Sequence, residues 1–316
     1  MARWTLIAVV AAALLWSGWW FVGARATETA VTEGLAQAEA QGWRVERADL
    51  SVAGFPNRFD VTLTEPRITA PAGWALAAPI LRAFALSYRP NHVIAVAPPE
   101  MVLTDPTLGD VDITSDDLRA SLIVSASTQP VLDRATLVAE DLGLAGAGWT
   151  ARLDRGQVAT RQAAGPTVHD IAVDLVTLAL PAAAGTVERV DLDATVTLDR
   201  AVGAGAAPRL DRLELRSGEM VWGDVSARMS GEMSVMSDGT PRGAFSLRLT
   251  GWERLLDLAV AGGLLPEGQA PLITAGLRGL SDGSGEATVP VEMADGQLLL
   301  LGFPIAPLPR LPVPGR

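Results

Sequence analysis

The sequence predicts a mainly β protein, in which an N-terminal transmembrane helix precedes an elongated antiparallel sheet with a few short helices. Three observations support this fold class. An apolar run opens the chain, apolar and polar residues then alternate over about 200 residues, and helical spacing returns only briefly near the C-terminus. Alternation with a period of two is typical of an antiparallel sheet that buries one face and solvates the other.

Residues 1–25 are expected to form a membrane anchor. The run from Trp4 to Val22 holds 19 residues without a charge, between Arg3 and Arg25. This length is close to the ~20 residues that a spanning helix needs. An interfacial aromatic belt is expected at its far end, where the aromatic residues Trp16, Trp19, Trp20 and Phe21 gather. The alternative is a cleaved signal peptide, because residues 24–26 fit an A-x-A cleavage site.

The next segment, residues 26–42, is expected to be a stalk helix that ends at Gly42. Its apolar residues Ala30, Val31, Leu35 and Ala38 recur at helical spacing. No later segment is long and apolar enough to span a membrane, since Leu298–Pro309 is short and contains three prolines. Everything after residue 26 is therefore expected on one side of the membrane.

Residues 43–316 are predicted to form one β-rich domain with a helical insertion near residues 250–281. Alternation is clearest in Val190–Leu198, where Asp and Thr separate the apolar residues. A T-x-x-E capping box at Thr250 predicts a helix over about 251–263, and a second helix is expected over 273–280. Asp295-Gly296 predicts a hairpin between two apolar strands. The proline-rich end, residues 305–312, is expected to be extended without a regular element.

A weak internal repeat occurs in the first half of the chain. Residues 65–74 align without gaps with residues 140–149, and both copies begin with Glu and end with Gly-Trp. Residues 103–106 echo residues 63–66. Either this is coincidence in an Ala- and Gly-rich chain, or a strand–turn–strand unit recurs with a Trp packed on the sheet.

The composition excludes several chemistries. The chain has no Cys, two His and 25 basic residues that are all Arg, so thiolate nucleophiles, Cys-type zinc sites and Lys Schiff bases are absent. The net charge of −11 argues against nucleic acid as a partner. His92 is expected in an exposed turn and His169 is expected to be an exposed residue before a strand. We therefore expect a non-enzymatic protein without cofactors.

Acidic residues are dense between residues 100 and 141, which hold nine carboxylates and two Arg. Asp110 and Asp112 lie on one face of a predicted strand. A solvated strand face explains them, and the alternatives are a calcium site or a carboxylate pair of the glycosidase type. No motif with metal-ligand spacing supports a metal site, so none is predicted.

A short motif follows the stalk helix. It consists of Gly54, Phe55, Pro56, Arg58, Phe59 and Asp60. Gly54 permits a turn and Pro56 fixes it, while Arg58 and Asp60 share a strand face and could pair. We expect a structural corner that orients the first hairpin, with a binding role as the alternative.

This motif after an anchor and a short helix resembles an uncharacterised bacterial family of inner-membrane-anchored periplasmic proteins, known only as a domain of unknown function. Residues 250–253 and the closing segment 295–309 resemble the same family. The resemblance implies an inner-membrane anchor, a periplasmic β-rich body and no catalytic residues. More distantly, the layout is similar to AsmA-like envelope proteins, which are associated with lipid homeostasis.

These observations predict a protein that binds lipid or an envelope partner through an apolar sheet face. That face is either an open groove, or it is closed in a sandwich or barrel. The second hypothesis is a scaffold with protein partners only, which would use the proline-rich tail 304–314. The third is a carboxylate-based hydrolase.

Overall fold

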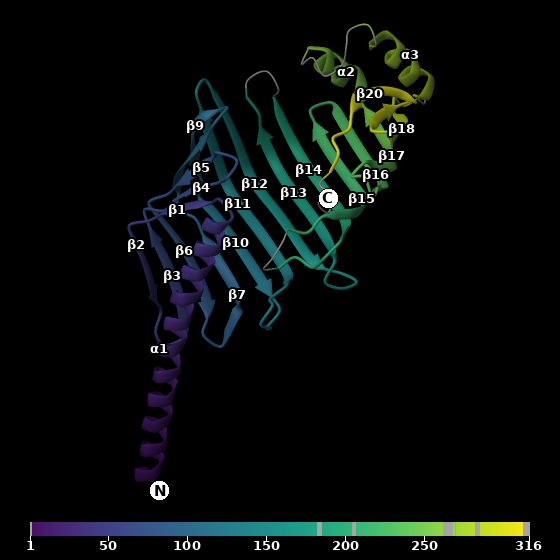
Figure 1. Ribbon diagram of the computed structural model, residues 1–316. Coiled ribbons are helices and arrows are strands. Elements are labelled where there is room, and N and C mark those ends of the chain that lie inside the picture. Colours follow the sequence, from purple (N-terminus) through teal and green to yellow (C-terminus); the bar gives the residue numbers. More distant parts are fainter. Residues whose placement is uncertain are drawn as a thin grey trace. The chain divides into compact units, whose positions relative to one another are not determined.

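The computed structural model describes residues 2–181, 185–203, 207–261, 268, 270–281 and 285–311. These residues form a long N-terminal helix and a large antiparallel β structure with two short helices, which confirms the predicted fold class (Figure 1). Contacts divide the chain into two compact units, Met1–Ala126 with Ala135–Arg155, and Ser127–Arg134 with Gly156–Arg316. The predicted β-rich domain 43–316 includes parts of both units, which are described separately below.

The N-terminal helix α1 (Ala2–Ala40) is continuous through the residues expected as anchor and as stalk (Figure 1). Its apolar part is long enough to cross a membrane. An 18-residue stretch of the helix has a mean hydropathy of 1.9, and only 6% of this stretch is buried within the protein. The helix ends where Gly42 takes a positive φ of 91° and donates its backbone N–H to Glu39 O. A left-handed glycine directly after a helix is a common stop signal.

The first unit builds its sheet from short strands. Their bounds are β1 (Arg44–Glu46), β2 (Asp49–Ala53), β3 (Arg58–Thr64), β4 (Arg67–Thr69), β5 (Ala75–Ala77), β6 (Ile80–Leu86), β7 (Arg89–Val96), β8 (Glu100–Asp105), β9 (Gly109–Thr114) and β10 (Asp117–Val124). The longer strands β11 (Leu132–Gly146) and β12 (Trp149–Gln162) contain residues of both units. Antiparallel pairing forms a lower half, β2-β3-β6-β7-β10, and an upper half, β1-β4-β5-β8-β9-β11, named as they lie in Figure 1.

A line of bends, here called the crease, joins the two halves. It consists of residues 65–66, 78–79, 97–99 and 115–116, each between a lower and an upper strand. Backbone hydrogen bonds join neighbouring bends along the crease, from Glu65 N to Pro79 O and from Ser115 N to Pro99 O. Proline interrupts a β ladder, and Glu65 adds a positive φ of 49°. Three of the four bends contain proline, while the bend at residues 115–116 contains none, and the four lie next to one another across the sheet.

The internal repeat has a structural counterpart. The first copy runs from the crease through β4 into a tight turn, and the second begins inside β11, where Glu140 O accepts the N–H of the crease residue Asp116. In the turns that end the two copies, Gly73 and Gly148 have positive φ values of 95° and 80°. Trp74 packs edge-on against Trp43, and the Trp149 indole lies over Gly146. The echo at residues 103–106 differs, because it enters a hairpin turn instead of the crease.

The second unit is an antiparallel meander of longer strands. They are β13 (Val168–Ala179), β14 (Thr186–Leu198), β15 (Leu210–Trp222), β16 (Val225–Val235), β17 (Pro241–Thr250), β18 (Ala287–Ala294), β19 (Gln297–Leu300) and β20 (Phe303–Pro307). Each pairs with the next along the chain. One face carries Arg–carboxylate pairs, and the other packs Ala194, Leu215, Met233, Phe245 and Val291 into a core.

Two short helices, α2 (Trp252–Ala261) and α3 (Ala270–Leu280), lie at one end of this meander (Figure 1). Both were predicted, and they bury Trp252, Ile273 and Leu277 against Ala287 and Val289 of β18. The predicted hairpin at Asp295-Gly296 is confirmed, with positive φ at both turn residues.

The C-terminal tail corrects one prediction. Residues 305–312 were expected to lack regular structure, but β20 pairs with β19 over Phe303–Pro307. Leu311 then donates its backbone N–H to Gly239 O and packs against the core that contains Phe245. Proline tolerates an edge position such as this one, because one side of an edge strand makes no ladder bonds. The tail, as far as residue 311, therefore belongs to the folded unit.

Candidate functional site

The predicted motif lies directly against α1, and together they form what we call the helix–motif junction (residues 16–24 and 54–60). Trp20 is 6% exposed and packs with Ala24 on Phe59, which is 4% exposed. Two indole N–H groups donate to motif backbone carbonyls, Trp16 to Pro56 O at 3.0 Å and Trp20 to Arg58 O at 2.7 Å. The aromatic belt expected to face lipid therefore also holds the first hairpin.

Each motif residue has a defined place at the junction. Gly54 has a φ of +100°, and its carbonyl accepts the Arg58 N–H, which closes the loop. A Cβ at Gly54 would lie 2.9 Å from Arg58 O, so the turn requires glycine. The Phe55–Pro56 peptide bond is cis, and Phe55 stacks on Phe21 while remaining 53% exposed.

The charged residues of the motif pair with each other. Arg58 Nη2 donates to Asp60 Oδ2 at 2.7 Å, as the shared strand face suggests, and its guanidinium carbon lies 5.6 Å from the Phe84 ring centroid. Half of the Arg58 side chain is exposed, whereas most of the Asp60 side chain is covered. An exposed pair of this kind contributes little to stability, so its geometric effect on the strand entry is the larger one.

An apolar trough extends from Phe59 over the lower half of the sheet. We call a row of residues that lie opposite one another on neighbouring strands a rung. Strand register aligns three apolar rungs over β3, β6, β7 and β10, the third of which includes Ala97 just after β7. They are Phe59–Ala85–Val93–Leu122, Val61–Ala83–Ala95–Ala120 and Leu63–Leu81–Ala97–Leu118. A cavity of about 260 Å³ lies over the second and third rungs, with Leu137 of β11 at its side. Leu122 and Leu137 are 42% and 44% exposed, and the first rung begins where α1 packs on Phe59.

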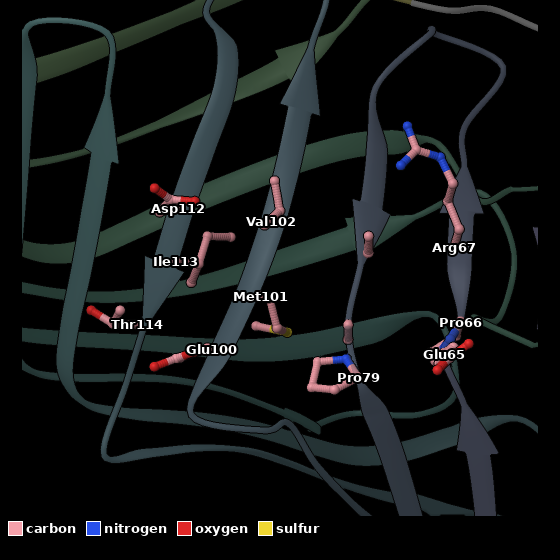
Figure 2. A pocket seen from close by; sticks show the side chains of 12 residues that line it. Glu65, Pro66, Arg67, Pro79, Glu100, Met101, Val102, Asp112, Ile113 and Thr114 are labelled. Carbon is pink, nitrogen blue, oxygen red and sulfur yellow. The ribbon is translucent and has the colours of Figure 1, made fainter.

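A larger cavity, of about 620 Å³, lies over the upper half and is called here the upper pocket. Register places Arg67, Ala77, Val102 and Asp112 on one rung, and Glu100 opposite Thr114 on the next. Figure 2 shows Glu100 and Asp112 on neighbouring strands, with Arg67 across the pocket on β4. The Cα atoms of diagonal cross-strand neighbours are ~7–8 Å apart, so the register makes Glu100 and Asp112 a candidate carboxylate pair of the glycosidase type.

The chemistry available in the upper pocket is limited by exposure. Glycosidase-type acid catalysis needs one carboxyl that is kept protonated by an apolar environment. Glu65, Glu100 and Asp112 are all exposed to solvent. Among the residues that the structure describes, no three His, Asp or Glu side chains gather closely enough to hold a metal ion. The pocket therefore offers a mixed polar surface and lacks a buried acid.

Both predicted histidine positions were wrong. His92 lies inside β7 instead of a turn, is half-buried, and its Nε2 is 2.9 Å from Ser121 Oγ. His169 is 2% exposed within β13, where its Nδ1 is 3.5 Å from Thr160 Oγ1. Neither belongs to the cluster of Trp20, Ala24 and Phe59, and neither lines the upper pocket. The expected strand began at Ile171 and left His169 outside it, although alternation in an extended strand places His169 on the same face as Ile171 and Val173.

Comparisons with known proteins give one match. A family model described as "Uncharacterized protein conserved in bacteria (DUF2125)" matches residues 20–309. A search of curated proteins and a search of solved structures gave no match. The matched range begins at Trp20, at the junction, and includes both the trough and the upper pocket. The likeness to AsmA-like envelope proteins stays a prediction.

Proposed function

The chain belongs to this family of uncharacterised bacterial proteins, and on that premise we propose that it is a non-enzymatic lipid-binding protein of the cell envelope. In this proposal α1 spans the inner membrane, the β structure lies in the periplasm, and the apolar trough holds an acyl chain. The lipid comes from the same membrane that α1 spans.

The observation that supports this function most is the continuity between the helix and the trough. Phe59 contacts Trp20 and Ala24 of α1 and also begins the first rung, so apolar surface continues from the helix onto the sheet. Two further rungs follow, each ~6.6 Å along the strands. An acyl chain that leaves the bilayer beside α1 would move along apolar side chains and avoid the energetic cost of entering water.

Two other observations favour binding over catalysis. The chain lacks Cys and Lys, and the pocket carboxylates face solvent, so no activated nucleophile or buried acid is in evidence among the described residues. The trough is lined mostly by Ala, Val and Leu, which supply apolar contact without reactive groups. Apolar cavities with few polar groups are typical of sites for lipid-like ligands.

The experiment starts with the full-length protein, purified from bacterial membranes in mild detergent. Cells are first supplied with a fatty acid that bears a photoreactive diazirine, so that their phospholipids carry it. Ala95 lies in the middle rung, and its neighbour Ile94 is 37% exposed on the opposite face of β7. We expect Ala95→Glu to reduce lipid cross-linking at least about fivefold, because an acyl chain that lies over this position would have to cover the carboxylate and remove it from water.

The matched control is Ile94→Glu, which adds the same charge one residue away on the other face. It should cross-link lipid like the unaltered protein, and both variants should show the same circular dichroism spectrum. Equal cross-linking by Ala95→Glu and Ile94→Glu, or label mapped to peptides outside β3, β6, β7, β10 and β11, would reject lipid binding in the trough.

A further inference from the structure

The register between α1 and the motif loop places the loop beside the apolar helix instead of beyond its end. The hydrogen bond from Trp16 Nε1 to Pro56 O sets this register, and the bond from Trp20 to Arg58 O fixes the next turn. The apolar run Trp4–Val22 ends at Val22. The loop at Pro56 therefore lies about six residues, or ~9 Å along the helix axis, before the end of the run.

This position of the loop along α1 is inconsistent with a β structure that lies entirely outside the membrane. If the loop lay in water, only Trp4–Leu15 would remain for the bilayer, which is about 12 residues and ~18 Å. The hydrocarbon core is ~30 Å thick, and the head-group layers bring the total to ~40–45 Å. The full run reaches ~28 Å, so it matches the core only when its last turns, and the loop beside them, enter the bilayer surface.

The side chains around the loop suit that depth. Phe55 is 53% exposed and stacks on Phe21, which is 64% exposed, while Trp19 is 57% exposed. Trp is enriched at the level of the head groups, and exposed Phe side chains supply apolar surface that inserts at the boundary between head groups and acyl chains. The two indole donors also satisfy the carbonyls of Pro56 and Arg58, which lowers the cost of placing this backbone at a depth with little water.

We propose that the motif loop, Gly54–Asn57, is a second membrane-contacting element, which seats in the head-group layer of the leaflet next to the β structure. The proposal rests on the membrane-spanning role of α1 and adds a function for the motif. Two attachment points fix both the depth and the rotation of the first unit, so that the junction and the end of the trough next to it lie at the bilayer surface.

The absence of Cys makes a direct test simple, because each single-Cys variant carries one label. Full-length Phe55→Cys and Asn57→Cys are labelled with the fluorophore NBD and reconstituted into phosphatidylethanolamine–phosphatidylglycerol vesicles, with quenching nitroxides near the lipid head groups or deep in the acyl chains. Leu108→Cys is the matched control, since Leu108 is 51% exposed at the β8–β9 turn of the same unit. Val10→Cys reports on the apolar run of α1, on the N-terminal side of the junction.

We expect the shallow nitroxide to quench Phe55 and Asn57 labels at least about threefold more than the Leu108 label, and the deep nitroxide to quench the Val10 label most. Quenching at both loop positions that equals Leu108, with Val10 quenched, would overturn the proposal. An unquenched Val10 label would overturn it as well, because α1 would not span. If the loop labels are quenched but no lipid cross-links to the trough, the lipid-binding function is rejected. The proposal that the motif loop contacts the membrane is then still supported.

Discussion

At the scale of single residues, the junction shows how a side chain can serve two environments. Trp16 and Trp20 have large apolar rings and one N–H donor each, and the donor needs an acceptor when the ring is covered. The loop carbonyls of Pro56 and Arg58 supply these acceptors. The sequence locates the aromatic cluster, but it does not indicate that the motif 40 residues later is its partner.

Gly23 gives a sharp test of helix packing at the junction. A Cβ at Gly23 would lie 2.5 Å from Phe59 Cζ, whereas a Cβ at Gly18 of the same helix has nothing within 4 Å. We expect Gly23→Ala to lower the free energy of unfolding by ~1–3 kcal/mol through overpacking. Gly18→Ala should leave it unchanged or raise it slightly. Denaturation in detergent, followed by Trp fluorescence, measures both, and equal midpoints would contradict the described packing.

At the scale of elements, the two faces of the meander in the second unit have different chemistry. Arg216 of β15 pairs with Asp193 of β14 and with Asp170 of β13, which also accepts the Thr195 hydroxyl at 2.9 Å. Period-two alternation predicts that such residues share a face. Register decides which of them meet, and the register contains bulges between Asp193 and Ala194 that the sequence pattern does not show.

This ion-pair cluster predicts a dependence of stability on pH. The Thr195 hydroxyl and then Arg216 lower the pKa of Asp170 below its ordinary value of 3.8, and Arg216 lowers the pKa of Asp193. Because these pKa values are lower in the folded protein, the stabilisation is present above about pH 4 and is lost as the pH falls through the folded pKa values.

The measurement compares urea midpoints of the full-length protein and its Asp170→Asn variant at pH 6 and at about pH 3. The variant should be less stable than the unaltered protein at pH 6, and the difference should shrink at the lower pH. A difference that stays constant or grows on acidification would show that Asp170 does not gain its stabilisation as a carboxylate.

At the scale of the whole molecule, membrane topology is the property that decides the proposed function. The residues flanking the apolar run are nearly balanced in positive charge, with Arg3 on one side and Arg25 on the other. Orientation is therefore weakly specified by the positive-inside rule. The net charge of −11 also disfavours adhesion of the β structure to anionic lipid, which leaves contact to the apolar junction.

Labelling of single-Cys variants in intact cells tests this topology. We expect a membrane-impermeant maleimide to label Leu108→Cys before lysis, after the outer membrane has been permeabilised, because the proposed function places the β structure in the periplasm. Arg3→Cys should react only after the inner membrane is broken. Reversal of the two results would place the β structure in the cytoplasm and reject the envelope function.

The sequence by itself determined the long apolar N-terminal helix, the β class, the two C-terminal helices, the Asp295-Gly296 hairpin and the family. Each depends on local pattern: run length, the period of alternation, or the φ preference of one residue. Only the tertiary structure decided the partner of the aromatic cluster, the burial of His169, the place of the tail and the alignment of the apolar rungs. These depend on register and on contacts between distant residues, and shifting one strand by a single residue would move its side chains to the opposite face.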